Sequence, residues 1–150
     1  MLSITEEQAK KIKSLRIQNQ IIDSTSNLYL VFGDNNIEQI YFDNCSFSGA
    51  GFHELNIFPF ASRIGLTRCG LNLDDLESLL YSSNPYEQLE VLDLSGNNFG
   101  NKRLFVDVLR RTIFQVKSLE KLIILDNRFD QSIVPLIKYY GGPYIRKIIL

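Results

Sequence analysis

The sequence predicts a mixed α/β fold in which short parallel strands alternate with longer connecting segments. Three observations predict it. The stretch LEVLDLSGNNF, at 89–99, spaces its leucines as a short strand followed by a turn. The same spacing recurs along the chain at intervals of 24 to 30 residues. The segments between these copies are long enough for helices, and three of them have an apolar stripe at helical spacing.

The stretch at 89–99 indicates how one copy folds. Leu92 and Leu94 point to the interior, while the polar residues between and after them point outward. Asn97 follows in the turn, where its amide can donate and accept hydrogen bonds across to the neighbouring copy. Phe99 then covers the turn from the apolar side. Because one copy cannot bury its own apolar face, we expect further copies on both sides.

Six copies of this pattern fit the chain. Their first apolar positions are Ile12, Ile37, Ala61, Leu89, Leu119 and Ile145. The copies that begin at 89 and 119 match at every key position. The copies that begin at 37 and 61 have Cys45 and Cys69 in place of the asparagine, and the first copy has Gln20 there. The last copy reaches only as far as Leu150.

The connecting segments differ in their patterns. Residues 1–11 form an N-terminal capping segment, in which Thr5 and Gln8 have the spacing of a capping box that opens a short helix. The segment 23–36 contains a continuous apolar run, which indicates irregular structure or an extra strand. The segment 48–60, with two glycines and a proline, is also irregular.

Helices are predicted in the other three segments. The first has Asn72 as its N-cap, ends before Pro85, and buries Leu76, Leu79 and Leu80. The second, after residue 99, has one apolar face made of Leu104, Phe105, Val108, Leu109 and Thr112. In the third, Ser132 can cap and Pro135 lies in the first turn. This helix ends at the Gly-Gly-Pro sequence 141–143 and packs through Leu136, Ile137 and Tyr140.

Composition indicates a single domain over residues 1–150, with 45% hydrophobic residues and only four prolines. No apolar run approaches the roughly 20 residues of a membrane span, and the N-terminus lacks the apolar core of a secretory signal. The net charge is −1, yet residues 34–90 hold nine acids against two arginines, and residues 101–150 hold ten bases against four acids. One interpretation is that these charged residues lie on the solvated outer faces of helices. The other is that the basic C-terminal end binds an anionic partner, or the acidic middle of another copy of the chain.

Catalytic chemistry is not indicated, so we expect no enzyme. His53 is the only histidine, and no nucleophile or phosphate-loop pattern is present. Cys45 and Cys69 occupy equivalent turn positions, which favours buried structural thiols over a disulfide or a metal site. Reduced, buried cysteines indicate the cytosol or the nucleus, and we expect a cytoplasmic protein. The basic helix near residue 103 lacks the interleaved aromatics of nucleic-acid binders. We therefore expect no cofactor, metal, small-molecule substrate, nucleic acid or membrane as a ligand.

On these six copies, the chain resembles leucine-rich-repeat proteins. Its spacing and its alternation of Cys and Asn resemble the ribonuclease-inhibitor-like subclass, and the resemblance covers about residues 12–150. The resemblance implies a curved right-handed solenoid with a parallel β-sheet on the concave face and helices on the convex face. It also implies that the concave face binds proteins, although such a motif specifies fold far more than function.

The outward strand positions define a candidate partner-binding surface. Its residues are Tyr41, Arg63, Asp93, Lys121, Ile123 and Leu125. The N-terminal end of this face is polar, and the C-terminal end turns apolar, which is unusual for a solvated strand face. Aromatic and arginine side chains are the expected anchors of binding. Alternatively, Ile123 and Leu125 are covered by a further domain or a terminal segment.

The leading functional hypothesis is a non-catalytic protein–protein interaction module, or scaffold, that binds its partner through the concave strand face. One alternative is an inhibitor or activator of an enzyme or small GTPase, since relatives resembling this subclass include ribonuclease inhibitors and the activating protein of the Ran GTPase. Another is a structural subunit of a larger assembly. Because the last copy stops inside a strand without a polar cap, we also expect either a longer protein or a C-terminal coil covered by a partner or by self-association.

Overall fold

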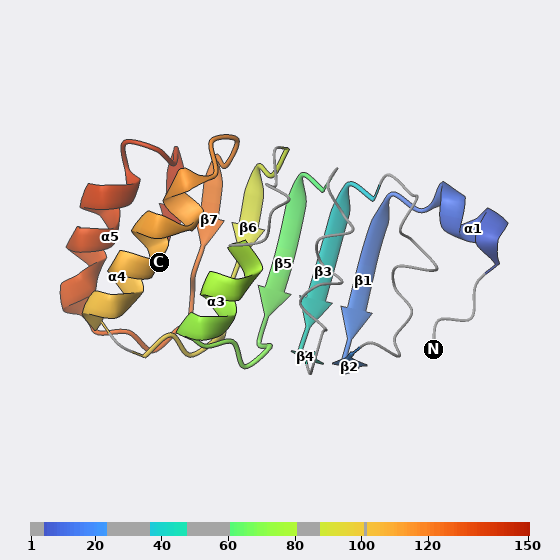
Figure 1. Ribbon diagram of the computed structural model, residues 1–150, viewed down its shortest axis with the longest axis horizontal. Helices are drawn as coiled ribbons and strands as arrows, with labels where there is room; N and C mark the ends of the chain where they lie inside the picture. The colour runs from blue at the N-terminus through green and yellow to red at the C-terminus, as the bar shows by residue number, and fades with distance from the viewer. Residues whose placement is uncertain (1–4, 24–36, 48–60, 81–87, 101) are drawn as a thin grey trace.

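The computed structural model describes residues 5–23, 37–47, 61–80, 88–100 and 102–150 (Figure 1). In chain order, the elements of these ranges are α1 (Glu6–Lys11), β1 (Ser14–Gln18), β2 (Ile21–Ile22), β3 (Gln39–Asp43), β4 (Ser46–Phe47), β5 (Arg63–Thr67), α3 (Leu73–Leu80), β6 (Val91–Asp93), α4 (Lys102–Arg111), the 3-10 helix η2 (Ile113–Gln115), β7 (Lys121–Ile123), the 3-10 helix η3 (Gln131–Ile133), α5 (Val134–Gly141) and β8 (Lys147–Ile149).

Six of the strands form one parallel sheet in the order β1-β3-β5-β6-β7-β8, and they lie side by side in Figure 1. This sheet confirms the predicted mixed α/β class and the predicted parallel strands. The short strands β2 and β4 make a separate parallel pair, which joins Ile21 to Ser46 and Ile22 to Phe47. No pattern in the sequence indicated this second pair.

The pairing register of the large sheet matches the alignment of the six copies. Leu92 lies opposite Ile64 on one side and Leu122 on the other. At the next position, Asp93 lies opposite Gly65 and Ile123. Because side chains alternate between the two faces of a sheet, this register gathers the apolar positions of every copy on one face.

Helices α3, α4 and α5 cover the apolar face of the sheet at its C-terminal strands (Figure 1). Leu92 and Leu122 are fully buried, and they belong to one continuous core that runs through the described part of the chain. Helices α3, α4 and α5 follow one another along the same side of the sheet, and α4 contacts both of its neighbours (Figure 1). Phe105 of α4 stacks on Phe99, with ring centroids 5.1 Å apart. The opposite face of the sheet therefore carries the outward side chains.

The turns after the strands have the predicted hydrogen bonding. The Asn97 amide oxygen accepts from the backbone N–H groups of Cys69 and Leu71, at 3.1 and 3.0 Å, and its nitrogen donates to the carbonyls of Leu66 and Leu94, at 2.7 and 2.8 Å. Asn127 in turn accepts from the Asn97 N–H at 3.1 Å. These bonds link the turns that contain Cys69, Asn97 and Asn127.

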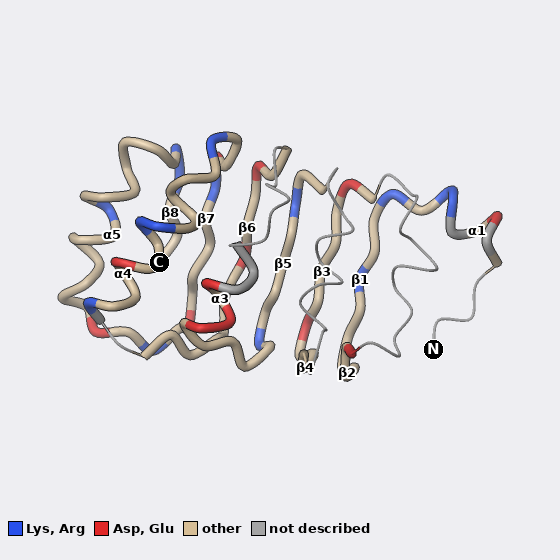
Figure 2. Tube along the Cα trace, in the orientation of Figure 1, with Lys and Arg blue, Asp and Glu red and all other residues tan. Residues whose placement is uncertain are grey.

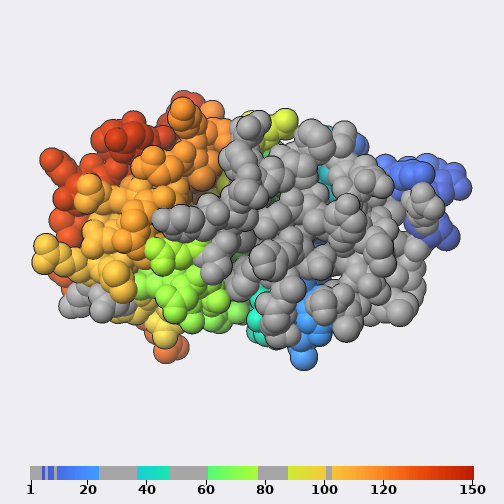
Figure 3. All heavy atoms as spheres, viewed as in Figure 1, coloured from blue at the N-terminus to red at the C-terminus, as the bar shows by residue number. Residues whose placement is uncertain are grey.

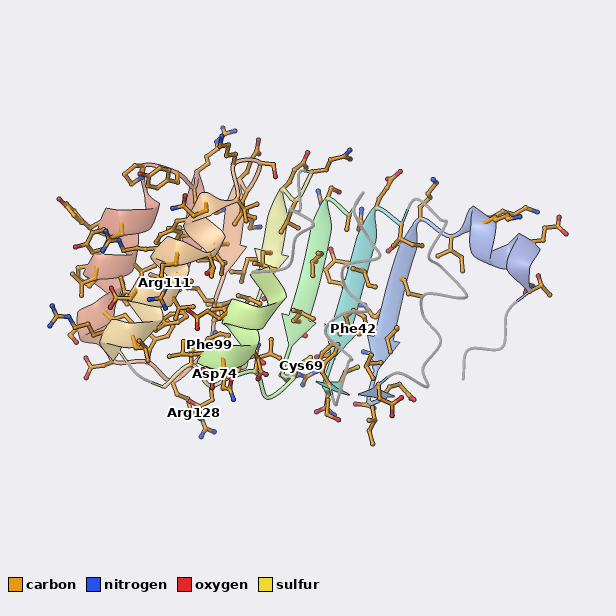
Figure 4. All side chains as sticks on the ribbon, in the orientation of Figure 1. Phe42, Cys69, Asp74, Phe99, Arg111 and Arg128 are labelled. Atoms are coloured by element: carbon orange, nitrogen blue, oxygen red, sulfur yellow. The ribbon has the colours of Figure 1, made fainter. Side chains whose placement is uncertain are left out.

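The two cysteines take the same position as free, buried thiols, as predicted. The Cys69 thiol lies 3.3 Å from the Thr67 carbonyl oxygen and 3.6 Å from that of Phe42 (Figure 4). The thiol therefore donates where the side-chain NH₂ group of an asparagine would donate. Burial raises the pKa of the Cys69 thiol to about 11. A thiol with this pKa stays protonated and acts as a weak donor, not as a nucleophile.

The predicted helix starts are confirmed in two places and corrected in a third. Thr5 and Gln8 form the expected capping box, and Asn72 and Asp75 exchange reciprocal bonds of 2.9 and 3.0 Å. The predicted cap Ser132 is wrong, because the cap is Asp130, two residues earlier, whose carboxylate accepts from the Ser132 N–H at 2.8 Å and opens η3. Proline lies in the first turn of α5, as predicted.

Two residues predicted to be buried are exposed. Leu104 is 47% exposed, because the buried face of α4 is centred on Phe105 and Leu109, and Leu104 lies about 100° round the helix from Phe105. Leu136 is 44% exposed, since Ile137 occupies the inward position of α5. The predictions for 24–36 and 48–60, for His53 and for the end of the helix at Pro85 lie outside the described residues.

Candidate protein-binding surface

The outward side chains of the large sheet form a continuous surface, which we call the outer strand face. It consists of Ser14, Arg16, Gln18, Gln39, Tyr41, Arg63, Gly65, Thr67, Val91, Asp93, Lys121, Ile123, Lys147 and Ile149. One line of mutually paired residues crosses its middle, and we call it the central row: Arg16, Tyr41, Gly65, Asp93, Ile123 and Ile149. The side chains of the central row, glycine apart, are exposed or half-buried, so this face is accessible to a partner.

An arginine and a tyrosine stack at the N-terminal end of the central row. The Arg16 guanidinium carbon lies 5.0 Å from the centroid of the Tyr41 ring, which is the geometry of a cation–π contact. On its other side the ring extends over Gly65, where a Cβ atom would lie only 2.5 Å from the Tyr41 Cδ1 atom. Glycine at 65 therefore gives the Tyr41 ring room to lie across β5.

The C-terminal end of the central row is apolar. Ile123 and Ile149 are half-buried neighbours in the register. In the adjacent row, Val91 pairs with Lys121, which in turn pairs with Lys147. Leu125, which follows β7, is 40% exposed. Apolar side chains thus reach the surface in the central row at this end, next to the lysines of the adjacent row.

A charged cluster lies at the ends of the strands. The Asp43 carboxylate accepts two bonds from the Arg68 guanidinium, at 2.5 and 3.0 Å, and one from the Thr67 hydroxyl, at 2.8 Å. The Arg68 hydrogen bonds are the main reason that the pKa of Asp43 falls to about 2, although burial alone would raise it. Asp43 is consequently ionised and already engaged at neutral pH.

This cluster borders an open groove of about 810 Å³ along the turns that follow the strands. The basic side chains in its lining are Arg16, Arg68 and Arg128, and the acidic ones are Asp43 and Asp126. The groove thus extends the outer strand face over the turns. None of these arginines was among the predicted site residues, because their roles depend on contacts between copies and not on spacing within one copy.

The six predicted site residues are placed as follows. Tyr41, Asp93 and Ile123 share the central row, and Arg63 and Lys121 share the row beside it, one on each side of Val91. Leu125 lies in the turn after β7. The neighbouring strands β3, β5, β6 and β7 therefore bring the first five of these residues onto one surface, and Leu125 follows in the turn. The Asp93 carboxylate is partly engaged, since it accepts from the Ser95 N–H and hydroxyl at 3.0 and 2.6 Å.

Within the described ranges, no three His, Cys, Asp or Glu side chains are grouped in a way that could hold a metal ion. No helix in the same ranges has both the length and the apolar character needed to cross a membrane. No protein-family model matches the chain, and no curated protein matches its sequence.

Proposed function

We propose that this chain is a leucine-rich-repeat domain of the ribonuclease-inhibitor-like kind, a right-handed solenoid with the strands on its concave face. We further propose that it binds another protein through the outer strand face and performs no catalysis. The unpaired, buried thiols of Cys45 and Cys69 favour a cytosolic location.

Backbone conformation supports the repeat assignment. One turn residue occupies the same position in five successive copies and has a positive φ, between 52° and 73°, in each of them. These residues are Asn19, Asn44, Arg68, Gly96 and Asp126. The N–H groups of the first four donate to the carbonyl of the residue before the equivalent turn in the next copy, at 2.8 to 3.1 Å. The same turn is thus repeated with the same bond to its neighbour, although the side chains differ.

The observation that carries the binding proposal is the composition of the outer strand face. A stacked arginine and tyrosine lie at one end of the central row, and accessible isoleucines lie at the other. Arginine and tyrosine side chains provide most of the energy at many protein interfaces, and an accessible apolar patch provides the area that a partner covers. Side chains on a strand scaffold are also held in place before binding, which lowers the entropic cost of association.

Quantitative affinity purification from the source cells tests this proposal. The bait is the full chain, in wild-type form and as the variants Tyr41→Ala, Arg63→Glu and Lys117→Glu. Lys117→Glu is the matched control, because it makes the same charge change as Arg63→Glu at an exposed residue outside the strands. We expect a defined partner that is retained by Lys117→Glu and is reduced at least tenfold by the two strand-face variants.

Two controls make the result decisive. Urea unfolding of each purified variant must show a folded protein, so that the loss of a partner reports on the surface. A partner that binds all three variants equally would place binding elsewhere on the molecule and would refute the strand-face proposal. A catalytic turnover that copurifies with the chain and is abolished by Tyr41→Ala would refute the non-catalytic part.

A further inference from the structure

A second surface lies between α4 and α5, on the helix side of the sheet. Two adjoining hollows of about 440 and 400 Å³ lie along these helices, and both are lined by Asp107, Arg110 and Tyr140. We call the combined hollow the α4–α5 groove. The buried strand residues point toward the helices, whereas the outer strand face points away from them, so the groove is separate from the surface described above.

The centre of the groove is an arginine stacked on a tyrosine. The Arg110 guanidinium carbon lies 4.4 Å from the centroid of the Tyr140 ring. The Tyr139 ring meets Tyr140 edge to face, with centroids 5.1 Å apart. These contacts hold the planar groups in defined positions at the surface, and preorganised planar groups lose little entropy on binding.

The lining of the groove is predominantly basic. Both hollows share Arg110 and the acidic Asp107, while Arg111 lines one of them and Arg103 the other. Figure 2 shows where the basic and acidic residues lie along the chain. Arg111 also bonds to Glu77 of α3 at 2.5 Å, which fixes its side chain at the edge of the groove nearest α3 (Figure 4). A site with this charge favours an anionic occupant.

Exposed apolar side chains gather on the same elements. Of the six large apolar side chains that are exposed in the described ranges, four belong to α4, α5 and the turn that follows α5: Leu104, Leu136, Tyr139 and Tyr144. Tyr139 is 74% exposed and Tyr144 is 65% exposed. These two helices lie side by side at the surface in Figure 3. An exposed cluster of Leu, Tyr and Arg is the composition expected of a protein-binding site.

We propose that the α4–α5 groove binds an acidic peptide segment of a partner protein that also carries a large apolar side chain. Carboxylates of the segment pair with Arg103 and Arg110, and its apolar side chain packs against Leu136 and the tyrosines. The stacked Arg110 presents its remaining N–H groups to a carboxylate in a fixed plane, which suits a bidentate pair. The chain would then hold one partner on the outer strand face and a second in the groove.

The test starts from a phage-displayed library of random twelve-residue peptides, panned against the purified full chain. Enriched peptides are synthesised with a fluorescent label, and their Kd values are measured by fluorescence polarisation at 50 and 300 mM NaCl. We expect enriched peptides with a net negative charge and at least one Leu, Phe or Tyr. Binding should weaken at the higher salt concentration, since the carboxylate contacts are screened.

Variants assign the binding to the groove. Arg110→Glu should weaken binding at least tenfold, while Lys117→Glu, the same charge change outside the groove, should change Kd less than twofold. Tyr41→Ala should also change Kd less than twofold, because it lies on the outer strand face. Light scattering and urea unfolding of Arg110→Glu check that the variant is a folded protein.

Three results would overturn the proposal. One is that no peptide is enriched above an unrelated control protein. Another is that the enriched peptides are neutral or basic, or bind Arg110→Glu as well as the wild type. The third is a dimer of the chain itself that dissociates on Arg110→Glu, which would assign the groove to a second copy and not to an acidic peptide.

Discussion

Replacing Asn97 by alanine tests how strongly the turns of neighbouring copies are linked. The buried amide accepts two bonds from backbone N–H groups and donates two short bonds to backbone carbonyls. Asn97→Ala removes all four and leaves buried polar groups without their partner. At a net value of about 1 kcal/mol for each bond, the free energy of unfolding should fall by roughly 4 kcal/mol.

Asn97→Cys is the matched variant, because a cysteine occupies this position in the copy before. The Cys69 thiol lies near two carbonyl oxygens, those of Phe42 and Thr67, and does not provide the strong acceptor of an amide. A cysteine at 97 should therefore restore the donor side of the lost bonds and leave the N–H groups of Cys69 and Leu71 poorly satisfied. We expect this variant to lose about 2 kcal/mol, half the loss of the alanine variant.

Urea unfolding followed by circular dichroism measures both losses, from the midpoint and the slope of each transition. The expected order of stability is wild type, then Asn97→Cys, then Asn97→Ala. A loss below about 1 kcal/mol for Asn97→Ala would refute the reasoning, since it would mean that the amide bonds are replaced without cost. A cysteine variant less stable than the alanine variant would refute the proposed role of the thiols.

The remaining predictions concern the core, the charged cluster and the thiols. Leu122→Ala should cost roughly 2–5 kcal/mol in urea unfolding, because Leu122 is fully buried in the sheet; a loss below 1 kcal/mol would contradict the register. The ionised Asp43, whose pKa is lowered from 3.8 to about 2, contributes stability that is complete above about pH 4 and is lost as the pH falls toward 2. In Arg68→Gln, the free energy of unfolding should fall less between these pH values than it does in the wild type. An equal fall in both proteins would refute the pairing of Arg68 with Asp43. Cys69 and its counterpart Cys45 should react with a thiol reagent at pH 8 only after urea unfolds the chain, whereas rapid reaction of the native protein would contradict their burial.

The strands could be predicted because two independent patterns coincide in the five complete copies. Alternation places Leu92 and Leu94 on one face, and the fixed distance to Asn97 sets where the strand must end. Both patterns depend on neighbours in sequence, so one chain is enough to detect them. The register between strands then follows, since matching copies place their apolar residues on the same face.

The helices could be predicted only in part. An apolar stripe indicates that a helix forms, but the direction it faces depends on what it packs against. Leu104 and Leu136 fit the stripe in the sequence and are nevertheless exposed, because Phe105 and Ile137 fill the space next to the sheet. The exposed Leu136 also lines the α4–α5 groove and distinguishes it from an ordinary polar helix surface, so this candidate site could not be found from the sequence.

The outer strand face could also be predicted only in part. Each residue of the central row could be assigned to it, but the stacking of Arg16 on Tyr41 and the space left by Gly65 involve three different copies. Spacing within a copy contains no information about which side chains meet across copies. The predicted set therefore included Tyr41 and omitted the arginine and the glycine that set the position of its ring.

The turn at Arg68 illustrates how the packing of copies determines local structure. A left-handed backbone normally favours glycine or asparagine, and adopting it costs other residues on the order of 1 kcal/mol. Arg68 nevertheless has a φ of 54°, like Asn44 before it and Gly96 after it. Its N–H donates to the Ser95 carbonyl at 2.9 Å, and its guanidinium binds Asp43 of the preceding copy. These bonds offset the strain, so the neighbouring turns, and not the residue type, fix the conformation at this position.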